Sequence, residues 1–207
     1  MSKLVCFIGV IGSGKDYKAD KLEEKGFIKL KIADEIYQEA EKELGIDLDS
    51  YENKENFKIG KIIIGRDILD SAIYEDTPIS PTDIYNIRTG REYLNCKGTF
   101  RRQRDKNYWL DQWWKKAVLL IDSEKNVTCS DLRYLNELRS IYEYKKNTSH
   151  NVKIIFCNYK SYKYNPNFPD SSEKLAQKIL SDGWCHEDEL PDDYIEKLLN
   201  NPELQVK

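Results

Sequence analysis

The chain has 207 residues and a formal net charge of −3, with 40% hydrophobic and 33% charged residues. This length and composition are typical of one globular domain with insertions and exclude a disordered or fibrous chain. The net negative charge argues against a general nucleic-acid binder, because such domains usually have a basic surface. The longest apolar run, residues 4–11, is far shorter than the roughly 20 residues of a membrane helix. We therefore expect no membrane span and a cytoplasmic location, in the host cell if the protein is viral.

The first part of the chain predicts alternating strands and helices. Residues 3–9 read as a strand whose sequence is apolar after Lys3, typical of a strand covered on both faces of a parallel sheet. A glycine-rich turn follows, and residues 15–25 favour a helix that Gly26 would terminate. We expect a second strand at residues 27–31 and a helix at 34–44 that ends at Gly45.

The middle of the chain has a weaker pattern. Between residues 48 and 80, six apolar residues could line one helix face: Ile62, Ile63, Ile64, Ile68, Leu69 and Ile73. Pro81 in a typical helix start predicts a helix over residues 81–95. Apolar residues at spacings of three and four predict an amphipathic helix over 108–121, with its tryptophans in the core.

Alternation resumes after residue 126. We expect a weak strand at 127–130, a helix at 132–146 and a strand at 152–157. Residues 159–170 read as a loop, followed by a helix from Ser171 or Ser172 to residue 181, and no last strand is recognisable. This order predicts an α/β fold of the P-loop NTPase type, a parallel sheet with helices on both faces. We expect one domain over residues 1–207, with a helical insertion or lid at about 48–107.

Residues 9–15, Gly-Val-Ile-Gly-Ser-Gly-Lys, match the GxxxxGK pattern of a phosphate-binding loop. The backbone N–H groups of such a loop surround phosphates, and the lysine reaches the outer ones. The pattern is informative here because it lies between an expected strand and an expected helix. We predict that the loop and the next residue bind ATP, through Gly9, Ile11, Gly12, Ser13, Gly14, Lys15 and Asp16.

Two aspartates are candidate Mg²⁺ ligands. Asp16 replaces the Ser or Thr that usually contacts Mg²⁺ after the loop lysine, and a carboxylate also suits a hard cation. Asp131 follows the strand expected at 127–130, at the edge of the sheet where ligands of α/β proteins bind. The alternatives are a helix-stabilising charge for Asp16 and a helix cap for Asp131.

Four arginines are candidate catalytic residues together with Lys15. Phosphoryl transfer depends on positioning and on charge stabilisation, so a kinase needs arginines around the transferred group and the acceptor phosphate. Arg91, Arg101 and Arg102 belong to a basic cluster between residues 88 and 106, and Arg133 follows Asp131 by two residues. The alternative for the cluster is a solvated basic face or a nucleic-acid contact.

These residues together resemble the bacteriophage-type deoxynucleoside monophosphate kinases, which pair a GxxxxGKD loop with an arginine-containing helix and a later Asp-x-Arg. The matching segments are residues 9–16, Arg91 through Gly98-Thr99, Tyr108-Trp109 and Asp131-x-Arg133. The resemblance covers about residues 3–157. It implies transfer of the ATP γ-phosphate to a deoxynucleoside monophosphate, which gives the diphosphate and ADP.

Two other functions stay open. Animal-type phosphomevalonate kinases are similar too, since they share a GKD loop and an Asp-x-Arg element. A protein of a different class would keep the fold without catalysis and bind nucleotide or nucleic acid. The sequence also leaves open the accepted base, the preference for deoxyribose, the phosphate that each arginine contacts and the formation of a homodimer.

Overall fold

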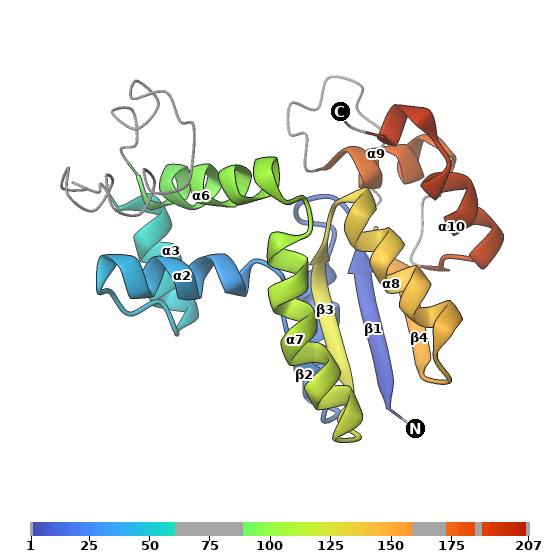
Figure 1. Cartoon of the computed structure of the whole chain (residues 1–207), viewed down its shortest axis with the longest axis horizontal. Helices are drawn as coiled ribbons and strands as arrows, with labels where there is room; N and C mark the ends of the chain where they lie inside the picture. Colours follow the sequence, from blue (N-terminus) through green and yellow to red (C-terminus); the bar gives the residue numbers. More distant parts are fainter. Residues whose placement is uncertain (1, 61–88, 159–172, 185–187, 206–207) are drawn as a thin grey trace. The chain divides into compact units, whose positions relative to one another are not determined.

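The computed structural model describes residues 2–60, 89–158, 173–184 and 188–205 (Figure 1). The chain forms two compact units, the first from Met1–Ile32 and Trp113–Lys207 and the second from Ala33–Gln112. The expected insertion at about 48–107 lies within the second unit. In the described ranges, no helix is long and apolar enough to cross a membrane.

A five-stranded sheet forms the centre of the first unit, with the strand order β2-β3-β1-β4-β5. The strands are β1 (Lys3–Ile8), β2 (Ile28–Lys29), β3 (Val127–Leu132), β4 (Asn151–Phe156) and β5 (Asp188–Glu189). β1 pairs in parallel with β3 and β4, β2 pairs in parallel with β3, and β5 is antiparallel to β4. The predicted α/β class is confirmed. The prediction of a wholly parallel sheet was wrong, because the last strand, β5, is antiparallel to β4.

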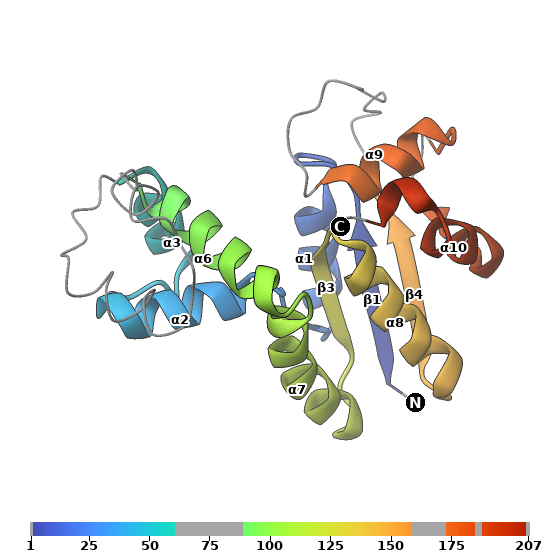
Figure 2. The same ribbon diagram turned by 45° about the horizontal axis from the view of Figure 1, so that its top comes forward.

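Helices pass over opposite faces of this sheet. α1 (Lys15–Glu23) connects β1 to β2, and α8 (Leu135–Asn147) connects β3 to β4 in the opposite direction along the sheet. Because such crossovers are right-handed, the two helices must lie on opposite faces. Figures 1 and 2 show α8 in front of the sheet and α1 behind it.

Burial of β1 on both faces explains its continuous apolar sequence. Leu4, Cys6 and Ile8 are completely buried. On the other face, Val5 and Phe7 pack with Ala19 of α1 in one apolar cluster. This central strand therefore gives the glycine-rich loop that follows it a rigid support.

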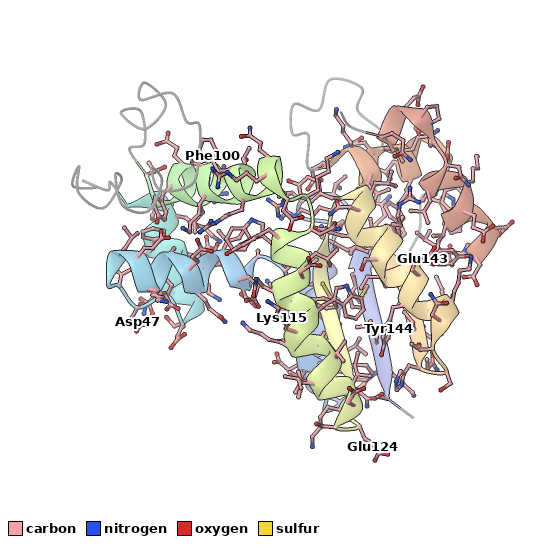
Figure 3. The ribbon with its side chains drawn as sticks, viewed as in Figure 1. Asp47, Phe100, Lys115, Glu124, Glu143 and Tyr144 are labelled. Atoms are coloured by element: carbon pink, nitrogen blue, oxygen red, sulfur yellow. The ribbon has the colours of Figure 1, made fainter. Side chains whose placement is uncertain are left out.

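Aromatic residues attach α7 (Tyr108–Asp122) to its neighbours in the first unit. The buried Trp113 donates its indole N–H to the carbonyl oxygen of Leu30 at 3.3 Å. Trp114 donates to Ser140 Oγ of α8 at 2.7 Å, and its ring lies 4.9 Å from that of Tyr144, labelled in Figure 3. The predicted amphipathic helix is confirmed.

The described part of the second unit is helical. It contains α2 (Asp34–Leu44), α3 (Tyr51–Ile59), α6 (Gly90–Arg104) and the start of α7. The helix expected over 81–95 was wrong in its bounds, because Thr89 is extended and forms a capping box with Glu92. Residues 81–88, the isoleucine-rich segment 62–73, the loop 159–170 and Ser171 and Ser172 lie outside the described residues.

The C-terminal part of the first unit differs most from expectation. α8 begins at Leu135 rather than residue 132, because β3 continues to Leu132. α9 (Lys174–Ser181) follows the described Glu173, and α10 (Asp192–Leu199) and a short 3-10 turn at Pro202–Leu204 were not predicted. β5 was also missed, since its two acidic residues have no apolar pattern.

Candidate phosphate-binding site

The glycine-rich loop, residues 9–15, connects the end of β1 to the start of α1. Gly14 has φ 94° at the N-cap position of α1, a left-handed conformation that glycine adopts without steric cost. A Cβ atom on Gly9 would lie 2.4 Å from both Cys157 O and Ser13 Oγ, so only glycine fits there. The glycines of the predicted pattern are therefore required by this conformation of the loop.

Lys15 folds back over the loop. Its Nζ donates to the carbonyl oxygens of Gly9 at 2.5 Å and Val10 at 2.8 Å, and the residue is buried. Burial lowers the pKa of Lys15, the negative charge of Glu173 opposes this, and the positive charge of Arg133 lowers the pKa further. The charge of Arg133, another of the predicted catalytic residues, therefore acts on Lys15.

Glu173 is a site residue that sequence reasoning missed. Its side chain is only 1% exposed, and its Oε2 accepts a hydrogen bond from the backbone N–H of Ile11 at 2.9 Å. A single glutamate just before α9 gives no sequence signal for contact with a loop about 160 positions earlier. Its position depends entirely on tertiary structure.

Asp16 lies beside one hydroxyl and two ammonium groups. Its Oδ1 accepts from Ser130 Oγ at 2.8 Å and lies 2.5 Å from Lys31 Nζ and 3.7 Å from Lys29 Nζ. Partial burial acts to raise the pKa of Asp16, but Lys31 and Ser130 outweigh it and hold the pKa below its usual value. A charged carboxylate beside a hydroxyl offers the hard oxygen donors that Mg²⁺ prefers.

Asp131 makes different contacts from its neighbour Ser130. Asp131 Oδ1 accepts the backbone N–H of Ile32 at 2.9 Å and the Cys129 thiol at 3.3 Å. Adjacent residues of a strand point to opposite faces, which fits the contact of Ser130 with Asp16 and that of Asp131 with Ile32. Asp131 is not the cap of α8, whose N-cap is Tyr134.

The turn after β3 places Arg133. The buried carboxylate of Glu137 accepts the backbone N–H of Arg133 at 2.8 Å and that of Tyr134 at 3.0 Å. These bonds fix the direction in which the chain leaves the sheet. Since β1 and β3 are adjacent and their connections leave for opposite faces, their carboxyl ends form a topological switch point, where α/β proteins bind ligands.

The other predicted arginines belong to the second unit, on α6. Arg91 is exposed, whereas Arg102 Nη1 donates to the carbonyl oxygen of Gly98 at 3.1 Å. Arg101 Nη2 lies 2.7 Å from Glu39 Oε1, and its guanidinium group stacks over the Tyr108 ring at 4.9 Å.

The ion pair between Arg101 and Glu39 belongs to a network that includes further ionic contacts between α2 and α6. The buried Lys97 lies 2.8 Å from Glu39 and also pairs with Glu43, which accepts the Tyr93 hydroxyl. Two glutamates of α2 therefore balance part of the positive charge that the sequence places on α6. This pairing joins residues more than 50 positions apart, which is why the local charge count did not predict it.

No protein-family model matches the chain, and no curated protein matches it. The chemistry of the site is therefore inferred from the residues that form it. In the first unit these are the glycine-rich loop with Lys15, the Asp16–Ser130 pair, Arg133 and the buried Glu173.

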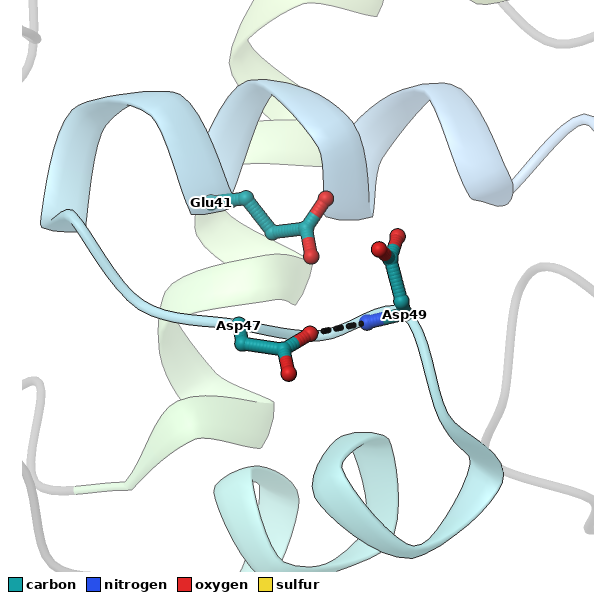
Figure 4. A group of neighbouring side chains, drawn as sticks. All are labelled: Glu41, Asp47 and Asp49. Carbon is teal, nitrogen blue, oxygen red and sulfur yellow. Dashed lines mark hydrogen bonds between the residues drawn. The ribbon is translucent and has the colours of Figure 1, made fainter.

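A second group of acidic residues lies in the second unit, on α2 and on the loop that leads to α3 (Figure 4). Oxygen atoms of Glu41, Asp47 and Asp49 lie within 4.8 Å of one another. Asp47 accepts the backbone N–H of Asp49 at 2.9 Å, and Glu41 accepts that of Leu48. These bonds satisfy the backbone of the connecting loop, so the cluster has a structural explanation and we assign it no metal.

Proposed function

We propose that the chain is a P-loop kinase of the bacteriophage deoxynucleoside monophosphate kinase type, which transfers the ATP γ-phosphate to a deoxynucleoside monophosphate. The observation that carries the proposal is the glycine-rich loop between β1 and α1, over which the buried Lys15 folds back, with Arg133 following the adjacent parallel strand β3. A glycine-rich loop at a helix N-terminus supplies N–H donors, and two nearby cations suit a polyphosphate.

In this proposal Lys15 and Arg133 stabilise the charge that develops on the transferred group. Lys15 exchanges its two backbone carbonyl partners for phosphate oxygens when ATP binds, and the N–H groups of Gly12, Ser13 and Gly14 hold the adjacent phosphates. Arg133 offers a planar guanidinium group that can donate bidentate hydrogen bonds to phosphate oxygens. No general base is required, because the second pKa of the acceptor phosphate is about 6.

Asp16, with Ser130 beside it, would hold Mg²⁺, which when bound neutralises phosphate charge. Asp131 is the other proposed ligand, although one of its oxygens already accepts the Ile32 N–H. Arg91, Arg101 and Arg102 of α6 are proposed, together with Arg133, to bind the acceptor and transferred phosphates. Among them Arg91 is exposed, whereas the charge of Arg101 is already paired with Glu39.

A coupled assay of ADP release with MgATP tests the proposal. Each deoxynucleoside monophosphate is added separately, with ribonucleotides and phosphomevalonate in parallel. Release that depends on a deoxynucleotide supports the kinase and gives its base preference. Turnover of phosphomevalonate alone would transfer the assignment to that kinase class. ATP binding without any acceptor-dependent release would favour a non-catalytic nucleotide-binding protein.

A further inference from the structure

The glycine-rich loop already contacts an anionic group of the chain itself. Glu173 is 1% exposed, and its Oε2 accepts the N–H of Ile11, a residue of the loop, at 2.9 Å. A buried carboxylate is unfavourable unless it is hydrogen-bonded and paired with positive charge. The loop N–H satisfies the first requirement.

Lys15 meets the second requirement. Its buried Nζ donates to the carbonyl oxygens of Gly9 and Val10 in the same loop that Glu173 contacts at Ile11, and the negative charge of Glu173 acts on Lys15. Arg133 adds a further positive charge to the same surroundings. In the absence of nucleotide, Glu173 therefore supplies negative charge beside Lys15, in addition to that of Asp16.

The phosphates of a nucleotide have the same charge as Glu173 and need the same partners. Backbone N–H groups at a helix N-terminus and the loop lysine are the donors that bind phosphate in such loops. In a buried site with low dielectric, a carboxylate beside these donors repels an incoming phosphate more strongly than it would in water. Phosphate and the Glu173 carboxylate therefore each weaken the binding of the other to the loop.

We propose that Glu173 is an internal counter-ion of the glycine-rich loop, which competes with the phosphates of ATP for Ile11 and Lys15 and so weakens nucleotide binding. This inference rests on the proposed function of the loop as an ATP site. Glu173 is then a positioning residue: it keeps the loop and Lys15 in place before ATP arrives, and ATP binding displaces it from the Ile11 N–H.

The test compares the wild-type chain with Glu173→Gln by isothermal titration calorimetry with MgATP. Glutamine has nearly the same shape and retains an oxygen that can accept the Ile11 N–H, so the substitution removes the charge and replaces the other carboxylate oxygen with an amide donor. We expect Glu173→Gln to bind ATP about 5- to 150-fold more tightly, the usual range for two coupled binding events. KM for ATP should fall by a similar factor, and the variant should melt at a lower temperature without nucleotide.

Two further variants separate charge from structure. Glu173→Asp retains the charge and should bind ATP more weakly than Glu173→Gln. Glu203→Gln, at an exposed position of the C-terminal 3-10 turn, makes the same change in net charge and should leave the affinity for ATP unchanged. A purely structural role for Glu173 would change the melting temperature without tightening ATP binding.

Equal or weaker ATP binding by folded Glu173→Gln would overturn the inference, and weaker binding would identify Glu173 as a residue that supports the bound nucleotide. If wild-type protein binds no ATP, the proposed function fails separately, and inorganic tripolyphosphate becomes the probe. Tighter binding of tripolyphosphate by Glu173→Gln would then support the counter-ion without a kinase. Absence of binding of either probe to either protein would overturn both proposals.

Discussion

Ser130 donates its hydroxyl to Asp16 Oδ1 at 2.8 Å and so joins the end of β3 to the first turn of α1. P-loop NTPases hold Mg²⁺ with a hydroxyl that follows the loop lysine and a carboxylate from another segment. In this chain the carboxylate follows the lysine and the hydroxyl comes from β3. The same two chemical groups are present with their positions exchanged.

Ser130→Ala should raise the Mg²⁺ concentration needed for half-maximal activity. The hydroxyl orients Asp16 and helps to keep its pKa low, and loss of a group that orients a metal ligand typically weakens the metal site about 10- to 100-fold. Kinase activity measured against Mg²⁺ concentration provides the check. Ser123→Ala, at an exposed position at the end of α7, is the matched control. An unchanged Mg²⁺ requirement in Ser130→Ala would exclude this role.

Lys15→Ala should lower kcat about 100- to 1,000-fold, the usual effect of removing one donor that stabilises transition-state charge. Lys21→Ala removes an exposed lysine from the same helix and should retain wild-type activity. Steady-state ADP release compares the two variants, and thermal unfolding verifies that Lys15→Ala is folded. Full activity of a folded Lys15→Ala variant is the result that contradicts the assignment.

Features that depend on residues close together in the sequence could be predicted from it. The apolar run of β1, the glycine-rich loop and the 3.6-residue period of α7 are local patterns. The start of α6 was readable as well, because Thr89 and Glu92 fit a capping box, but Pro81 gave the competing signal. Contacts between distant segments could not be predicted. The Glu173 bond to the loop and the Glu39 pair with Arg101 are decided by tertiary packing.

Gly9→Ala should disrupt the loop more than Gly26→Ala. A Cβ at position 9 would clash with Cys157 O and Ser13 Oγ, and overpacking of this kind typically costs about 1–3 kcal/mol in the free energy of unfolding. Gly26 has φ +85° with open space around it, so its substitution costs only the backbone strain of about 1–2 kcal/mol. The expected losses in the free energy of unfolding overlap for the two variants. The deciding measurement is therefore ATP affinity, which should fall in Gly9→Ala alone.

Arg91→Ala and Arg101→Ala should have different effects although both residues are on α6. Arg101 is paired with Glu39 at 2.7 Å, so its loss should reduce the free energy of unfolding by about 1–3 kcal/mol. Arg91 is exposed, so Arg91→Ala should change stability by less than about 0.5 kcal/mol while it raises KM for the acceptor. Urea denaturation and acceptor kinetics measure the two effects. A wild-type acceptor KM in Arg91→Ala would remove that residue from the proposed site.

The Glu39 network should make stability depend on pH. Burial acts to raise the pKa of Glu39, but hydrogen bonds from Lys97 and Arg101 outweigh it and hold the pKa below its usual value. A carboxylate whose pKa is lower in the folded state contributes stability that is fully present above its unfolded pKa, about 4.3. That contribution disappears as the pH falls through the folded-state value.

Glu39→Gln should therefore be less stable than wild type at pH 7 by about 1–3 kcal/mol, and the difference should shrink as the pH falls below about 4. Urea unfolding between pH 3 and pH 7 gives both curves. Glu52→Gln, at an exposed position on α3, should follow the wild-type curve throughout. If the Glu39→Gln curve instead stays parallel to the wild-type curve at every pH, the ion pairs of Glu39 contribute no net stability.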